Sequence, residues 1–184
     1  MASYAEVKKK VARLVDEIVD TINKLHSINP RYGKSLKAGL PASKKEIAQL
    51  EAYVNAKIPP SYRAFLELNN GYKGLSVNGD FLSIKDILPG SVLHKRMKKW
   101  RTEEIRDYGN TSVEKALVIA DTDGQPDVVY LDQNKPLENG EWQVVDWDHE
   151  SDSTYYSDLT GYLERCNRYY GFVLKSELKK SKKK

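Results

Sequence analysis

Residues 58–71 decide the fold, and they read Ile58-Pro59-Pro60-Ser61-Tyr62-Arg63-Ala64-Phe65-Leu66-Glu67-Leu68-Asn69-Asn70-Gly71. The two prolines end one helix and preset the backbone of the next, because proline is tolerated only in the first helical turn. Apolar side chains then recur on one face, at Tyr62, Phe65 and Leu66. The pair Asn70-Gly71 supplies a left-handed turn that ends this helix. We therefore expect a helical hairpin in which Tyr62, Phe65 and Leu66 are buried.

Two helices are expected upstream of this stretch. The first has one apolar stripe at three- and four-residue spacing, formed by Val7, Val11, Leu14, Val15, Ile18, Val19, Ile22 and Leu25. The second starts at a capping box, in which the Ser43 hydroxyl and the Glu46 carboxylate each satisfy a free backbone N–H. Its apolar side consists of Ile47, Leu50, Tyr53 and Val54.

Downstream of Gly71 the pattern changes to short strands, predicted at 75–77 and 81–84, and then to an amphipathic helix at 92–101 with a basic polar side. Three β-rich runs separated by turn residues follow, at 116–120, 128–131 and 142–145. A last helix begins at Leu159 and is expected to end before Tyr169. Helices first and a meander afterwards predict a single α+β domain, in which helices pack against an antiparallel-rich sheet meander.

The composition excludes several classes of protein. A chain of 184 residues with 40% hydrophobic residues can bury a core without disulfides or a structural metal. Cys166 is the only cysteine, and the three histidines lie far apart, so we expect no zinc site and no other metal or cofactor. Apolar runs are too short for a membrane span, and charge follows the first residues, so we expect a cytoplasmic protein that does not enter membranes.

The charge is distributed unevenly. Although the net charge is +4, residues 121–164 contain twelve acids against one base, Lys135, a net charge of −11 that leaves +15 for the rest. We call residues 121–164 the acidic segment. Such a segment repels phosphate and attracts a cationic surface, although a solvated face would account for it equally well. Five lysines close the chain, at Lys179, Lys180, Lys182, Lys183 and Lys184, and predict a disordered basic tail.

The hairpin stretch resembles the SMI1/KNR4 (SUKH) family, whose signature pairs isoleucine/leucine-proline, serine-tyrosine and phenylalanine-leucine with a closing asparagine-glycine. Later segments follow in the family order, from the turn at 119–124 to Trp147 and the Tyr162-Leu163 helix. We therefore divide the chain into an N-terminal helix and connector (1–38), an SMI1/KNR4-like domain (39–175) and the basic tail (176–184). The resemblance implies an α+β sheet with helices on one side.

The resemblance also implies a function. Bacterial members are immunity proteins that bind and block a toxin of a polymorphic or contact-dependent system, whereas eukaryotic members are regulatory adaptors tied to the cell wall. Neither branch is known for catalysis, so we expect no enzyme. We expect the acidic segment to bind a basic toxin domain, perhaps a nuclease, with Tyr155 and Tyr156 as aromatic anchors. The charges expected at this surface are Asp121, Asp123, Asp127, Asp148, Glu150 and Asp152.

The sequence offers three other interpretations of the chemistry. Asp121-Thr122-Asp123-Gly124 has some likeness to a calcium loop but lacks the EF-hand spacing and its final glutamate, so we interpret it as a hairpin turn. The acid/base candidates, clustered over 146–150, would need burial beside a nucleophile, and a solvated edge explains them more simply. A nucleic-acid-binding module would use the lysine tail and residues 95–101, but the acidic segment, which contains several of the aromatics, argues against it.

Overall fold

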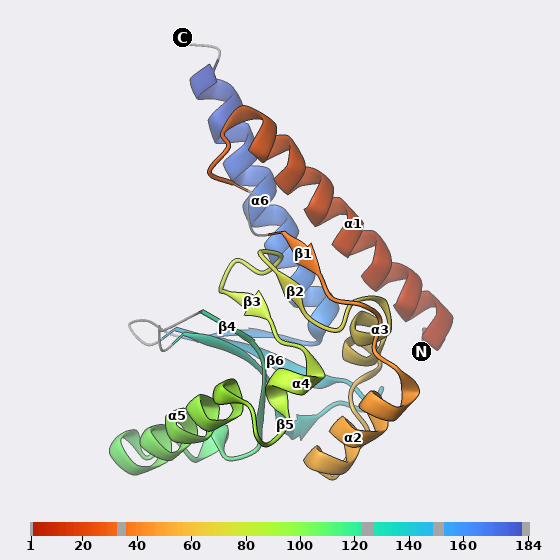
Figure 1. Cartoon of the computed structure of the whole chain (residues 1–184), viewed down its shortest axis with the longest axis vertical. Coiled ribbons are helices and arrows are strands. Elements are labelled where there is room, and N and C mark those ends of the chain that lie inside the picture. The colour runs from red at the N-terminus through yellow and green to blue at the C-terminus, as the bar shows by residue number, and fades with distance from the viewer. Residues whose placement is uncertain (1, 33–35, 123–126, 149–152, 182–184) are drawn as a thin grey trace.

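The computed structural model describes residues 2–32, 36–122, 127–148 and 153–181. In chain order its elements are α1 (Tyr4–Ile28), β1 (Lys37–Ala38), α2 (Lys44–Val54), α3 (Pro60–Leu68), β2 (Tyr72–Lys73), β3 (Asp80–Phe81), α4 (Ile84–Ile87), α5 (Val92–Tyr108), a 3-10 turn (Thr111–Val113), β4 (Ala116–Asp121), β5 (Val128–Pro136), β6 (Trp142–Trp147), β7 (Thr154–Tyr156) and α6 (Leu159–Ser181). The seven strands form one sheet in chain order, and every pairing is antiparallel (Figure 1). The predicted single α+β domain with an antiparallel meander is confirmed.

Helices cover both faces of the sheet. The register aligns Val118, Tyr130, Val145 and Tyr155 on one face. On the other face it aligns Leu117, Leu131, Val144 and Tyr156. Tyr130 contacts Trp100 of α5, with ring centroids 6.0 Å apart, whereas Tyr156 contacts Tyr162 of α6 at 5.5 Å. The expectation of helices on one side was therefore wrong, because the basic helix α5 buries its own apolar stripe against the second face.

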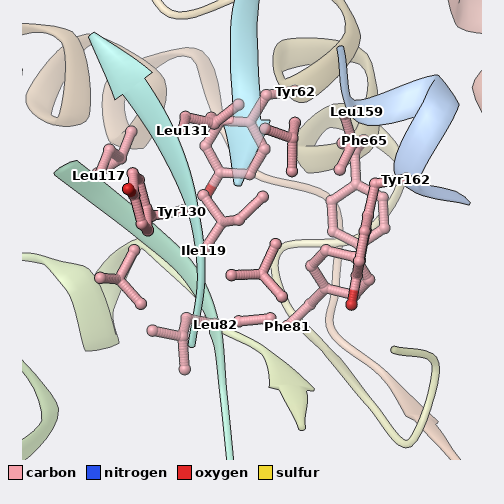
Figure 2. Close-up of a cluster of buried hydrophobic side chains, with 14 of the residues drawn as sticks. Tyr62, Phe65, Phe81, Leu82, Leu117, Ile119, Tyr130, Leu131, Leu159 and Tyr162 are labelled. Atoms are coloured by element: carbon pink, nitrogen blue, oxygen red, sulfur yellow. The ribbon is translucent and has the colours of Figure 1, made fainter. Parts of the chain in front are cut away.

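The helical hairpin anchors the core. Tyr62, Phe65 and Leu66 have no exposed surface, as predicted. The side chains of Tyr62 and Phe65 project from α3 toward the sheet (Figure 2). The ring of Phe65 lies 4.6 Å from that of Phe81 on β3, and Phe81 in turn contacts Tyr162 of α6. The hairpin, the sheet and the last helix therefore share one hydrophobic core.

The turn after α3 is closed by the Asn70-Gly71 pair. Gly71 has φ +86°, and a Cβ atom there would lie 2.9 Å from the backbone nitrogen of Ser83, so no other residue fits without movement. The Oδ1 atom of Asn70 accepts the backbone N–H of Ile84 at 2.7 Å. This predicted turn therefore ties α3 to the start of α4.

Helices α1 and α6 form a parallel pair. The contacts between them advance in the same direction along both helices. Lys10 pairs with Glu164 at 3.0 Å, Asn167 donates to Glu17 at 2.8 Å, and Asn29 donates to Glu177 at 3.2 Å. The C-terminal halves of both helices extend together beyond the sheet (Figure 1). Among the described residues, no helix is both long enough and apolar enough to cross a bilayer.

Three local predictions were wrong. Residues 75–77 form a loop between β2 and β3, in which the Ser76 hydroxyl lies 2.6 Å from Tyr162 Oη. Only the first residue of the predicted 81–84 strand, Phe81, belongs to a strand, because the Ser83 hydroxyl accepts the Asp86 N–H and starts α4. The last helix runs through Gly171 to Ser181 instead of ending before Tyr169. It therefore includes residues 176–181 of the expected tail, since packing against α1 offsets the roughly 1 kcal/mol cost of one glycine.

Candidate partner-binding surface

The sheet topology brings the acidic loops to one end of the meander. Asp121 at the end of β4 is aligned with Val128 at the start of β5, and Val128 is aligned with Trp147 at the end of β6. Asp127, directly before β5, and Asp148, directly after β6, therefore lie at the same end of the sheet. Asp127 and Asp148 are both partly exposed. We call this region the acidic end of the sheet.

Asp146 adds a third carboxylate to the acidic end. Its Oδ1 accepts a hydrogen bond from Asn78 Nδ2 at 2.6 Å. Burial raises the pKa of the Asp146 carboxyl, and the negative charges of Asp148 and Asp127 raise it further, against the opposing effect of Arg165. Asp127 and Asp148 therefore lie close enough to Asp146 to act on it electrostatically.

Asp121 does not present its charge at this surface. The residue is only 4% exposed, and its carboxylate pairs with the guanidinium of Arg96 on α5. A charge can be buried in this way when an opposite charge pairs with it, because the pairing offsets the cost of removing it from water. The carboxylate of Asp121 therefore fastens α5 to the end of β4 and is not available to a partner.

The two predicted anchors differ in accessibility. Tyr155 and Tyr156 lie in the edge strand β7, not at the start of the last helix. Tyr155 is 55% exposed, and the Nζ atom of Lys135 lies 5.4 Å from its ring centroid. Tyr156 is partly buried against Tyr162, and burial raises the pKa of its hydroxyl. Tyr155 is therefore the accessible aromatic residue of the pair.

Other predicted residues fall outside the described part of the chain. These are Asp123, Glu150 and Asp152 of the binding set, together with His149 of the acid/base cluster and the second half of the predicted turn at 121–124. Within the described residues, no three acidic, histidine or cysteine side chains are grouped as metal ligands.

Several acids of the acidic segment hold the fold together, a role that was not predicted from the sequence. Glu141 is 4% exposed, and its two oxygens accept the backbone N–H of Ser61 at 2.9 Å and the Ser61 hydroxyl at 2.6 Å. It thereby caps α3, whose N-cap residue Pro59 makes no side-chain cap. Asp158 caps α6 by accepting the N–H of Gly161 at 2.9 Å. An aspartate directly before a helical pattern is an N-cap signal, so the role of Asp158 can be predicted from the sequence. No local pattern predicts the contact between Glu141 and Ser61.

Glu141 also borders a cavity. A hollow of about 200 Å³ between α1 and α3 is lined by Ala2, Tyr4, Val7, Pro60, Asn139 and Glu141. Burial raises the pKa of Glu141, an attribute of some catalytic acids. Both of its oxygens are already engaged by Ser61, however, and the lining contains no serine, cysteine or histidine nucleophile. The contacts of Glu141 therefore indicate a helix cap.

The comparison with curated proteins gives no match. The model of the SMI1 / KNR4 family (SUKH-1) matches residues 41–165. The match starts just before α2 and ends within the first turns of α6, so it includes the hairpin, strands β2 to β7 and the acidic end, while α1, β1 and most of α6 lie outside it. Because the match covers well over half of the chain, the protein belongs to the SMI1/KNR4 family.

Proposed function

We propose that this chain is a cytoplasmic immunity protein that binds and neutralises a basic toxin domain, specifically a nuclease. The observation that carries the proposal is the acidic end of the sheet, where Asp127, Asp146 and Asp148 lie near the strand end and β7 displays Tyr155. Membership of the SMI1/KNR4 family supports it, because immunity proteins are one established branch of that family.

The proposed inhibition is by occlusion. A nuclease must present a cationic cleft to the phosphates of its substrate, and carboxylates at the acidic end would occupy that cleft. Long-range attraction between opposite charges would speed association at low salt, and an aromatic anchor would then slow dissociation. Tyr155 is our proposed anchor. Asp127 and Asp148, together with Asp123, Glu150 and Asp152 of the sequence, are the proposed steering charges.

The proposed protein acts by binding alone. The acidic residue with a raised pKa beside a cavity, Glu141, is engaged by the start of α3. Asp146, a partly buried acid whose pKa is also raised, accepts a hydrogen bond from Asn78. These contacts give each carboxylate a structural role, and they support a protein that inhibits without turning over a substrate.

The test uses the toxin domain encoded by the reading frame next to this chain's gene. Association with the immobilised toxin domain is measured over a range of salt concentrations for the wild type and for the variant D127N/D148N/E150Q/D152N. We expect the association rate of this variant to fall by about tenfold or more at low salt, with a flatter salt dependence.

The matched control is D16N/D20N/E103Q/D107N, which also removes four negative charges, but from α1 and α5. We expect it to associate nearly as fast as the wild type, because its charges lie away from the acidic end. Equal slowing by both variants would mean that only net charge matters. Unchanged inhibition by the first variant would overturn the acidic end as the binding surface, and absence of any inhibition by the wild type would overturn the immunity function.

A further inference from the structure

The outer side of α6 carries an aromatic residue between cations. Arg168, Phe172, Lys175 and Lys179 are spaced four, three and four residues apart, so they lie in one line along the helix. The buried residues of α6 lie on the opposite side of the helix, at Tyr162, Leu163, Cys166 and Glu177, so this line faces away from the core. Only its first turn approaches α1, because Glu164, four residues before Arg168, pairs with Lys10. All four residues are exposed, and Phe172 has 73% of its surface exposed. We call this line the cationic face of α6.

The charges of this face are available. Neighbouring cations are paired, since Lys180 contacts Glu177 at 2.8 Å and Lys10 contacts Glu164. Within the part of the chain that the structure describes, Arg168, Lys175 and Lys179 have no ion pair. The face lies beyond residue 165, where the family match ends, and on the portion of α6 that extends past the sheet (Figure 1). Because Phe172 is exposed and lies outside the family match, its side chain contributes little to the core of the SMI1/KNR4 domain.

We propose that the cationic face of α6 binds single-stranded nucleic acid. A second copy of this chain would place like charges opposite one another across the interface. An anionic membrane is a plane, whereas these cations are confined to a strip one side chain wide. A single strand combines a line of phosphates with unpaired flat bases, which matches cations on either side of an exposed aromatic ring.

The acidic end does not oppose this binding. The α6 residue whose charge acts on Asp146 of the acidic end is Arg165, and Phe172 and Lys175 lie seven and ten residues further along α6, which corresponds to about 10 and 15 Å. Charges separated by more than about 8 Å are largely screened at physiological salt. This inference is therefore independent of the proposed immunity function, and either can fail alone.

The test measures binding of a fluorescein-labelled oligothymidylate of about 12 nucleotides by fluorescence anisotropy. The full-length chain carries the background substitutions K182Q/K183Q/K184Q, so that the terminal lysines do not contribute. Three phosphate contacts predict that log Kobs falls with log salt concentration with a slope of about −2. The variant R168Q/K175Q should reduce that slope to about −0.7. Phe172→Ala should weaken binding by about tenfold with an unchanged slope, because base stacking is lost.

The matched control K95Q/K98Q removes two exposed cations from α5 and should leave binding unchanged. Thermal unfolding of Phe172→Ala should match the wild type, since the side chain is exposed. Loss of all binding in the background variant would show that only the terminal lysines act, and would overturn the proposal. Oligonucleotide binding that is unchanged in Phe172→Ala would also overturn the proposal. The chain could instead co-sediment with phosphatidylglycerol vesicles in a way that requires Phe172, and bind no oligonucleotide. That result would overturn the proposal and identify the cationic face of α6 as a membrane-binding surface.

Discussion

A single carboxylate from the connection between β5 and β6 completes the signature helix. The prolines that preset α3 cannot cap it, and Glu141, eighty residues further along the chain, accepts both polar hydrogens of Ser61. Burial opposes the charge of Glu141, while the hydrogen bonds from Ser61 favour it. Burial has the larger effect, and the pKa of Glu141 is raised.

The raised pKa predicts how stability depends on pH. The folded state holds the Glu141 proton more tightly than the unfolded state, so this residue's contribution is full below the ordinary glutamate pKa. The contribution declines as the pH rises through the raised value. We therefore expect the stability of Glu141→Gln, relative to the wild type, to improve from about pH 4 to about pH 7 in urea unfolding.

Glu46 is the matched control with the opposite sign. The backbone N–H and hydroxyl of Ser43 donate to its carboxylate and lower its pKa, so its contribution is present above the ordinary pKa and is lost as the pH falls. Glu46→Gln should therefore lose stability relative to the wild type as the pH rises. If both variants followed the same trend, Glu141 would not be the buried cap described here.

The buried ring of Phe65 provides a test of the core. Phe65→Ala should cost about 3–5 kcal/mol, because Phe65 is fully buried against Phe81 and its removal leaves a cavity. For a chain of this size, this corresponds to a fall in melting temperature of about 10 °C or more. Phe172→Ala, which removes the same ring from an exposed site, is the control. Similar melting temperatures for the two variants would mean that the inner face of α3 has been misassigned.

At the scale of elements, the helices and strands that could be predicted from the sequence are those with regularly spaced apolar residues or a clear start signal. The apolar stripe of α1, the capping box of α2 and the prolines of α3 all identify helices, and the three β-rich runs of β4, β5 and β6 identify the meander. The end of α6 could not be predicted, because it depends on contacts such as Asn29 with Glu177, which join distant parts of the chain. The apolar run at 75–77 has the composition of a strand, but Ser76 is bonded to Tyr162 instead of to a neighbouring strand.

The acidic segment illustrates the same limit at the candidate site. Its sequence indicates one surface, but Asp121, Asp132 and Glu141 are each buried to more than nine-tenths. Their partners include Arg96 on α5 and Ser61 on α3, and only the tertiary fold brings these together. The alignment of strand ends that gathers Asp127 and Asp148 follows from the meander, and it could be anticipated from sequence.

At the scale of the whole molecule, the added helix α1 is joined to the family domain through two elements. Lys8 of α1 pairs with Glu67 of α3 at 2.8 Å, and the C-terminal half of α1 packs along α6. Six of its residues are buried: Val11, Leu14, Val15, Ile18, Ile22 and Leu25. Most of these belong to the same hydrophobic cluster as the sheet. The helix therefore completes the core of the domain.

This shared core predicts one cooperative unfolding transition. Trp100, Trp142 and Trp147 report on α5 and the sheet, whereas circular dichroism at about 222 nm is dominated by the helices, including α1 and α6. Because α1 and the sheet bury one another's apolar surface, neither should persist alone, and the two signals should change at the same urea concentration. Ile18→Ala in α1 should shift both curves together, by about 2–5 kcal/mol. If only the circular dichroism curve moved, the α1 and α6 pair would be a separate unit attached to an independently stable SMI1/KNR4 domain.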